Sequence, residues 1–464
     1  MMDNNSKTPV SPQNNEEPTD ESNKIDTSQF KEMTLDELAN VLSLTIKHDH
    51  NNKLVVFLAM LSAYTDSSQI NISLNAPSST GKSFLAIEIA KLFPAEDKVE
   101  RSGSSPTAFF YETGVLIKEL NARLVSLERK ILIFYEQPNP QLQEKLRALM
   151  SHDSRELYYS FTNRVKGTNR VDKVILRGFA STIFCSAGLR LDEQETTRAI
   201  LLSPEATDEK ILAGIHSQAR RSANTEEYKA WLESQPKRTA LKDRIIAIRD
   251  EHVDEIIVPD PDGVEKRFRE MFPVVKPRHM RDINHLIQLI KAIALLNVWH
   301  RTQPDGTILA KQSDIDQAFD IWKVFSDSQE LNLPPMVMEF YADIIVPAYI
   351  TKFQSSIDQI QMAMQHEEIG LTQQELNSYH IEVKEKPMNG EQVRKQVLPQ
   401  LESSGVITQE KPKEGSDRRS RHIFPKWFPE GNDPKKPNNI GSGGGSDMPG
   451  VSAEEWERIK ELFF

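Results

Sequence analysis

Eight residues in the first quarter of the chain, 76–83, constrain its fold more than any other stretch. They read Ala-Pro-Ser-Ser-Thr-Gly-Lys-Ser and fit the phosphate-loop pattern, with alanine where the first glycine is usual. The alternation of apolar and polar residues over 70–74 predicts a buried strand, and residues 84–92 predict a helix. A phosphate loop requires this strand–loop–helix context, whereas a chance Gly-Lys-Ser at a helix start does not.

The octet predicts a site for ATP and Mg²⁺. Backbone N–H groups of residues 79–82 would surround the phosphates at the helix N-terminus. The Lys82 ammonium would contact the β- and γ-phosphate oxygens, and the Ser83 hydroxyl would bind Mg²⁺. The predicted nucleotide-binding residues are Pro77, Ser78, Ser79, Thr80, Gly81, Lys82 and Ser83.

Composition narrows the class of protein further. The chain of 464 residues has 57 basic and 68 acidic side chains, a net charge of −11, which argues against general coating of nucleic acid but allows local basic patches. Cys185 is its only cysteine, so a disulfide framework is excluded and a reducing compartment is favoured. No apolar stretch is long enough to span a membrane, so we expect a cytoplasmic protein.

Strands and helices alternate through the first half of the chain, which predicts an α/β fold with a mostly parallel sheet and helices on both faces. The later part reads as two helices, a strand, a charged loop and a return strand, which is typical of a winged helix. The predicted segments are a disordered acidic tail (1–32), a phosphate-loop core with N-terminal helices (33–205), a helical lid (206–332), a winged-helix domain (333–428), a Gly/Ser-rich flexible linker that is natural or a fusion (429–447) and an amphipathic helix for docking a partner protein or the same assembly (448–464).

The strand predicted over 131–135 is followed by two candidate catalytic residues, Glu136 and Gln137. Glu136 is the candidate acid on the metal side. Gln137 stands where a glutamate usually polarises the attacking water, and an amide can orient water but is a poor base. Hydrolysis is then slow, or another group assists, or the glutamine is a deliberate trap. In the alternative register, Tyr135 and Glu136 form the pair and Glu136 is the base.

Three further side chains are candidates for contacts with the γ-phosphate. Ser186 ends the next predicted strand and either senses the phosphate or caps the strand. Arg198 precedes a strand at the domain edge, as a finger reaching a neighbour's ATP or as a surface ion-pair residue. Arg281 begins a helix of the predicted lid and could reach the phosphate from that side, with Arg278 as the competing choice.

Two local basic patches predict contacts with the phosphate backbone of DNA. Residues 157–161 and 171–176 flank a Lys-Gly turn and predict a β-hairpin, for which a merely solvated hairpin is the alternative. No base-reading pattern accompanies either patch, so we expect binding to tolerate any sequence. The candidate DNA-binding residues are Arg164, Lys166, Arg170 and Lys173 in the hairpin and Arg418, Arg419 and Arg421 in the wing.

This order of elements resembles that of AAA+ ATPases, in particular the hairpin-bearing clade that includes the minichromosome-maintenance helicases. The helix from Arg281 is similar to the lid helix that carries the second sensor arginine of that family. Residues 176–179, 183–186 and 197–205 are similar to helicase-like ATPases of mobile elements. The resemblance covers about residues 50–428. Two departures are the lack of room for an N-terminal oligonucleotide-binding domain and the Glu-Gln pair in place of Asp-Glu.

The resemblance implies a DNA helicase or translocase that forms a homo-oligomeric, hexameric ring and serves the replication of a mobile element. ATP would lie between subunits, with Arg198 supplied by the neighbour of the subunit that supplies the phosphate loop. The hairpin would move along single-stranded DNA inside the ring, and the winged helix would bind duplex DNA. The alternatives are a non-translocating ATP switch, such as a helicase loader or replication initiator, and an ATP-dependent transcriptional regulator.

Overall fold

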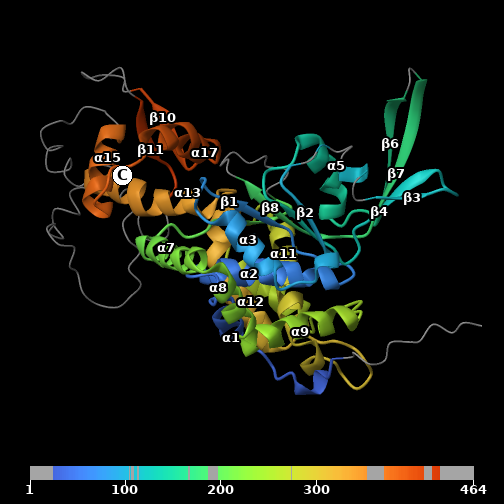
Figure 1. Cartoon of the computed structure of the whole chain (residues 1–464). Coiled ribbons are helices and arrows are strands. Elements are labelled where there is room, and N and C mark those ends of the chain that lie inside the picture. Colours follow the sequence, from blue (N-terminus) through green and yellow to red (C-terminus); the bar gives the residue numbers. More distant parts are fainter. Residues whose placement is uncertain are drawn as a thin grey trace, which may run out of the picture. The chain divides into compact units, whose positions relative to one another are not determined.

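The computed structural model describes residues 25–103, 105, 109–111, 114–165, 168–186, 197–272, 274–352, 370–411 and 421–428, with residues 161–165 and 168–172 described by their backbone alone. The chain forms two compact units, Met1–Pro335 and Met336–Phe464 (Figure 1).

A five-stranded parallel sheet forms the centre of the first unit, in the order β2-β5-β8-β1-β9. β1, β5 and β8 are buried along their whole length, as expected of strands covered on both faces. The fold is therefore α/β with a parallel sheet, as the alternation of strands and helices predicts. The strands are β1 (Ile72–Asn75), β2 (Lys98–Arg101), β5 (Ile131–Phe134), β8 (Ser181–Ser186) and β9 (Ile200–Leu202).

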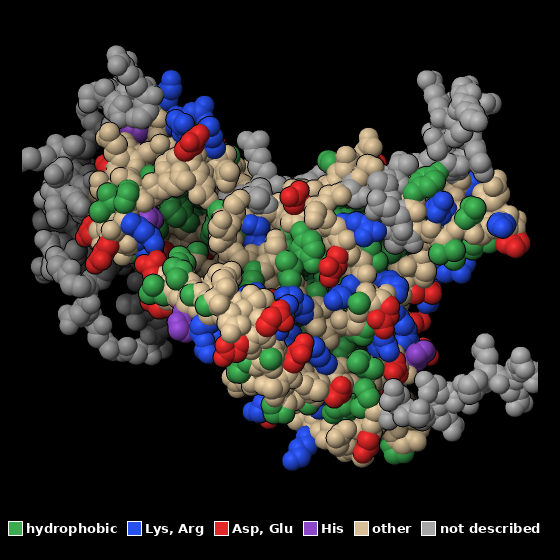
Figure 2. Space-filling model, in the orientation of Figure 1, with side chains coloured by type: hydrophobic (Ala, Val, Ile, Leu, Met, Phe, Trp, Pro, Cys, Tyr) green, Lys and Arg blue, Asp and Glu red, His purple; other side chains and the backbone are tan. Residues whose placement is uncertain are grey.

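A second sheet of four strands carries the predicted hairpin. β6 (Glu156–Val165) and β7 (Thr168–Arg177) pair antiparallel along their full length, which confirms the hairpin. β4 (Ala122–Ser126) pairs parallel with β7, and β3 (Val115–Ile117) pairs with β4; neither strand was predicted from the sequence. The hairpin extends away from the five-stranded sheet (Figure 1), and hydrophobic side chains lie exposed on this second sheet (Figure 2).

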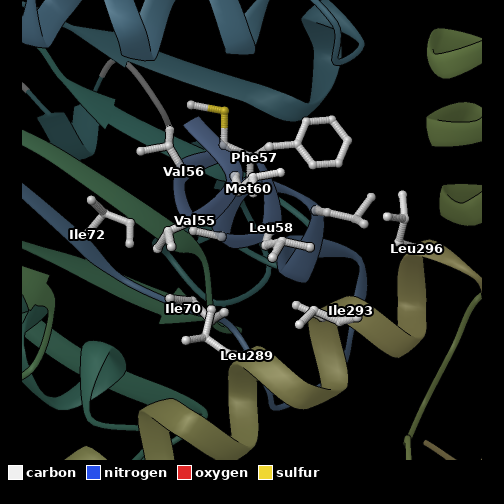
Figure 3. Close-up of a cluster of buried hydrophobic side chains, with 14 of the residues drawn as sticks. Val55, Val56, Phe57, Leu58, Met60, Ile70, Ile72, Leu289, Ile293 and Leu296 are labelled. Carbon is white, nitrogen blue, oxygen red and sulfur yellow. The ribbon is translucent and has the colours of Figure 1, made fainter. Parts of the chain in front are cut away.

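The main core lies where α2 (His50–Leu61) packs against the parallel sheet and α11 (His279–Leu296). α2 is buried on all sides, which an apolar helix tolerates only inside a protein. Its Val55 lies beside Ile70 and Ile72, and its Leu58 lies toward Ile293 of α11 (Figure 3).

The remaining helices of the first unit surround this core. α1 begins with a capping box, in which the Thr34 hydroxyl and the Glu37 carboxylate each accept the other's backbone N–H. No described helix is long and apolar enough to cross a membrane. The helices are α1 (Leu35–Leu42), α3 (Lys82–Ala90), α5 (Pro140–Met150), α7 (Asp208–Ala223), α8 (Thr225–Glu233), α9 (Pro236–Asp250), α10 (Pro261–Glu270) and α12 (Gln312–Glu330), with 3-10 turns at Thr27–Gln29, Ser62–Tyr64, Ala95–Asp97 and Val298–His300.

The boundary predicted for the disordered tail, residue 32, is wrong for the part from residue 25. Phe30 is buried and stacks on Trp299 with ring centroids 4.9 Å apart. The Glu32 carboxylate forms an ion pair of 2.6 Å with Arg301, whose side chain is almost fully buried. The stacking of Phe30 and the ion pair of Glu32 therefore hold residues 25–32 against the core.

The second unit contains the predicted order of helices and strands. Its described elements are α13 (Pro335–Phe340), a π-helical turn at Tyr341–Ile345 after which the helix continues to residue 352, α15 (Gln373–Lys384), α16 (Gly390–Gln392), a second π turn at Val393–Val397, α17 (Leu398–Ser403), β10 (Ile407–Glu410) and β11 (His422–Pro425). β10 and β11 pair antiparallel. Its assignment as a winged helix stays a prediction. The wing residues Arg418 and Arg419 and residues 429–464 lie outside the described residues.

Candidate nucleotide site

Three of the predicted groups meet at one edge of the parallel sheet. The phosphate loop follows β1, Gln137 lies just beyond β5, and Ser186 is the last residue of β8. β8 lies between β1 and β5, and the register pairs Asn75 with Ser186. Because the strands are parallel, their carboxyl ends open on the same side, which is where open α/β sheets bind ligands.

The loop between β1 and α3 has the backbone shape of an anion cradle. Ser79 and Gly81 have φ values of +67° and +96°. A Cβ on Gly81 would meet no atom within 4 Å, so the conformation rather than crowding favours glycine here. The first N–H groups of α3 have no acceptor within the helix, and the helix dipole adds positive charge at this end. The cradle therefore fits the phosphates of a nucleotide.

The Lys82 ammonium is held inside this loop. Its Nζ donates to the carbonyl oxygens of Ala76 and Pro77, each at 2.6 Å, and 7% of the residue is exposed. Burial lowers the pKa of Lys82 from its usual value. Cys185, next to Ser186 on β8, contacts the Ser83 side chain, and burial raises the pKa of its thiol to about 12, so the thiol stays neutral beside the lysine.

A hydrogen bond joins the ends of β5 and β8. The Ser186 hydroxyl donates to Oε1 of Gln137 at 3.1 Å, while Glu136 and Gln137 are both exposed. The Tyr135 hydroxyl bonds to Glu100, and burial raises its pKa. Gln137 is thus positioned beside the serine at the carboxyl ends of β5 and β8.

No cluster of three or more His, Cys, Asp or Glu side chains within the described part of the chain could bind a metal ion by itself. The expectation of Mg²⁺ therefore depends on Ser83, Glu136 and the nucleotide phosphates together. Ser83 is the second residue of α3, and Glu136 lies two residues beyond β5.

Arg198 and Arg281 lie at the opposite side of the sheet, where the amino-terminal ends of the parallel strands are. The pairing of Ile72 with Ile200 places Arg198 level with the start of β1. Its Nε donates to the Ser151 hydroxyl at 2.7 Å, and the Arg281 guanidinium donates to the hydroxyl of Thr197. A strand rises about 3.3 Å per residue. The residues of β1 and those just before it therefore separate both arginines from the phosphate loop by roughly 15 Å.

The structure therefore does not bring either arginine to the phosphate loop of its own chain, and a contact with phosphate would need a second copy. Arg281 is exposed, whereas the competing Arg278 is largely buried and forms two hydrogen bonds, 2.9 and 3.2 Å, with the Asp282 carboxylate. Of the two, Arg281 is the side chain presented to the surface.

The predicted DNA-binding residues of the hairpin follow its two arms. Arg164 pairs with Asn169 and Arg170 with Asn163, so both lie near the turn, and Lys166 in the turn lies outside the described residues. Lys173 is exposed further down β7. Arg177, at the base, is instead paired with Glu156 at 2.6 Å and stabilises the hairpin. In the second unit Arg421 is exposed just before β11.

Two contacts around the phosphate loop escaped the sequence analysis. Lys210, in the first turn of α7, forms an ion pair with the buried Asp49 and donates to the carbonyl oxygen of Thr80 at 3.5 Å. Glu88 of α3 is buried and forms an ion pair of 3.2 Å with Arg221 of α7. In the sequence, the contact between Glu88 and Arg221 is indicated only by the presence of a glutamate in a mostly apolar helix.

No family model and no curated protein matches the chain. Among solved structures, the chain is similar to a full-length MCM homolog from Methanopyrus kandleri, with 14% sequence identity and a TM-score of 0.39 over 64% of this chain. The chain covers 61% of that protein, less than two thirds of its length.

Proposed function

We propose that the protein is an AAA+ type ATPase that acts on DNA as a helicase or translocase. The observation that carries the proposal is the meeting of the phosphate loop, Gln137 and Ser186 at the carboxyl edge of one parallel sheet. Lys82 would leave the carbonyl oxygens of its loop to contact the β- and γ-phosphates, and Ser83 and Glu136 would hold Mg²⁺. The metal ion, when bound, neutralises charge on the phosphates.

Gln137 would position the water that attacks the γ-phosphate. Its Oε1 accepts the hydrogen bond from Ser186, so its amide N–H groups would be the donors to water. An N–H donor can hold the oxygen of water but cannot take a proton from it, so the proton must pass to another group or to the phosphate. Slow ATP hydrolysis is the expected consequence.

Assembly would complete the site. Since Arg198 and Arg281 lie at the edge opposite the phosphate loop, a head-to-tail ring or arc would bring them toward the ATP of a neighbouring copy. The β6–β7 hairpin, with its basic residues near the turn, would contact single-stranded DNA by its phosphates. The winged helix of the second unit would contact duplex DNA.

A second candidate function, a non-translocating ATP switch such as a helicase loader or initiator, is favoured by the same Ser186–Gln137 hydrogen bond. A protein that binds ATP but lacks a carboxylate base hydrolyses it slowly. It therefore stays in the ATP-bound state longer than a rapid translocase does.

Unwinding of forked DNA distinguishes the two functions. A helicase separates the strands with ATP but not with a non-hydrolysable analogue, and Lys82→Ala separates none. A switch binds DNA equally with ATP and the analogue and separates no strands with either. If Lys82→Ala binds fluorescent ATP with unchanged affinity, the nucleotide site itself is wrong.

A further inference from the structure

α7 presents its apolar side to solvent. The residues that lie against the rest of the unit are spaced three and four apart and are small or charged: Lys210, Ala213, Ser217 and Arg221. The large aliphatic side chains face outward, with Ile211, Leu212 and Ile215 exposed by 51%, 66% and 61% (Figure 2). A surface helix of a globular protein normally buries its apolar face against the core. We therefore expect another protein surface to cover the exposed stripe of α7.

Ion pairs fix this orientation at both ends of the helix. In the first turn, Lys210 pairs with Asp49, which is almost fully buried. In the last turn, Arg221 pairs with Glu88 of α3 and lies over the Phe84 ring, with 5.1 Å from its guanidinium carbon to the ring centroid. Rolling α7 to bury its aliphatic side chains would break both pairs. Glu88 would keep its ion pair of 2.7 Å with Lys91, whereas the buried Asp49 carboxylate would lose its ion pair with Lys210.

A second apolar patch lies beside the arginines at the opposite edge. Val274, Val275 and Met280 are exposed by 67%, 68% and 75%, and they flank the N-terminal end of α11, which carries Arg281. The first turn of α7 exposes Asp208 and Glu209, whereas the exposed Arg281 lies beside the second patch. Lys276 also lies there but is already paired with Glu330 at 2.6 Å, so the opposite charges are the two carboxylates of α7 and the Arg281 guanidinium.

We propose that the α7 stripe of one copy of the chain packs on the 274–280 patch of the next copy. The inference rests on the proposed ATPase function and names the surfaces that would join its subunits. One patch adjoins the phosphate loop through Lys210 and Thr80, and the other adjoins Arg281, so this contact brings the arginines of one copy toward the nucleotide of its neighbour. Different surfaces meet, so the contact is heterologous and repeats into a ring or arc.

Cross-linking of mixed cysteine variants tests which surfaces meet. Cys185, the only native cysteine, is 1% exposed, so a thiol-specific cross-linker has little native target. Ile215→Cys and Met280→Cys are prepared separately as full-length proteins and treated with a short bismaleimide, alone and mixed, in the presence of a non-hydrolysable ATP analogue. We expect cross-linked dimers from the mixture and none from either variant alone.

Two results would overturn the proposal. The first is a dimer from Ile215→Cys alone, which would mean that α7 pairs with itself. The second is the absence of a mixed product, whether light scattering shows an oligomer joined by other surfaces or a monomer whose stripe is covered by another occupant, such as residues 448–464. Fluorescent ATP titration of the same variants keeps the questions separate, because a monomer that binds ATP contradicts the docking surface and leaves nucleotide binding in place.

Charge substitution provides an independent measurement. Ile211→Asp with Ile215→Asp places two carboxylates in the stripe without disturbing any buried side chain, and assembly measured by light scattering should weaken about tenfold or more. ATP affinity of the single chain should not change. Val324→Asp on α12, exposed by 57% and outside both patches, is the matched control. Equal assembly of the double variant and the control would contradict the proposal.

Discussion

Gln137 is the residue on which the rate of the proposed reaction depends. It is exposed at the end of β5 and its side-chain oxygen already accepts a hydrogen bond from Ser186. Gln137→Glu replaces the amide by a carboxylate, which can accept a proton from water. We expect ATP turnover to rise, toward the ~10²–10⁴-fold that general bases contribute. Steady-state phosphate release measures the change.

Glu136→Gln is the matched control for this prediction. If Glu136 lies on the metal side, its substitution weakens Mg²⁺-dependent binding of ATP, and Gln137→Glu still accelerates hydrolysis. If Gln137→Glu leaves turnover flat and Glu136→Gln abolishes it with ATP binding intact, Glu136 is the base and the register with Tyr135 is the correct one.

His285 predicts how the first unit responds to acid. Its ring is buried 6.5 Å from that of Trp322, and burial lowers its pKa to about 4, although Asp282 opposes the shift. In the unfolded chain the pKa returns to about 6.5. Between these values the unfolded state binds more protons, so stability is full above pH 6.5 and falls as the pH drops toward 4. The expected loss between pH 7 and 5 is about 2 kcal/mol.

Urea denaturation at pH 7 and pH 5 measures this loss. His285→Gln should remove part of the difference between the two pH values, and His152, whose pKa burial also lowers to about 4, should account for a further part with the same sign. His216→Gln on the exposed side of α7 is the control. A pH difference that survives unchanged in His285→Gln would mean that the buried ring is not the titrating group.

At the scale of single residues, the sequence pointed to groups that the structure brings together, while their roles stay predictions. Lys82 and Ser83 follow from one octet, and Gln137 and Ser186 follow from the ends of two apolar strands. The burial of His285 could not be predicted, because it depends on the packing of α11 against elements that are distant along the chain.

Among the structural elements, the β6–β7 hairpin carries the most direct expectation for DNA. Lys166→Ala with Arg170→Ala should weaken binding of single-stranded DNA and unwinding while sparing ATPase activity measured without DNA. Loss of two phosphate contacts should flatten the dependence of log affinity on log salt by ~0.7 per contact. Fluorescence anisotropy over a range of salt concentrations gives this slope.

Lys323→Ala on the exposed face of α12 is the control for a general loss of positive charge. Lys173→Ala, lower on β7, should flatten the slope further if the nucleic acid follows the arm of the hairpin. An unchanged slope in the double variant would exclude the hairpin turn as a contact and direct attention to Arg421 and the rest of the predicted wing.

The hydrophobic pattern predicted the buried elements well, because β5 is apolar over its whole length and β8 and α2 each contain a continuous apolar run. It missed β3 and β4. These strands are short and partly exposed, and β4 is stabilised by parallel pairing with β7, some fifty residues later in the chain. A strand that depends on such a distant partner is hard to predict from its own sequence alone.

For the whole molecule, the order of the strands determines what one copy can do. The sequence predicted a parallel sheet but not that β9 lies beside β1, and this pairing places Arg198 at the edge away from the phosphate loop. Arg198 cannot reach the phosphate loop of its own chain. Any role of this arginine in ATP hydrolysis therefore requires a neighbouring copy. The proposed head-to-tail contact would also cover both apolar patches.

Arg198→Ala should therefore leave ATP binding by a single chain intact and lower hydrolysis in the assembled protein. Arginine fingers contribute ~10³–10⁵-fold to phosphoryl transfer, so the loss should be large wherever hydrolysis is measurable. Mixing this variant with Lys82→Ala should restore part of the activity, because some interfaces then join an intact phosphate loop to an intact arginine. Arg198 also donates to the Ser151 hydroxyl, so Ser151→Ala is the control for a local structural effect. If Ser151→Ala reproduces the loss and no mixing ratio restores hydrolysis, Arg198 holds α5 in place and does not act on the ATP of a neighbouring copy.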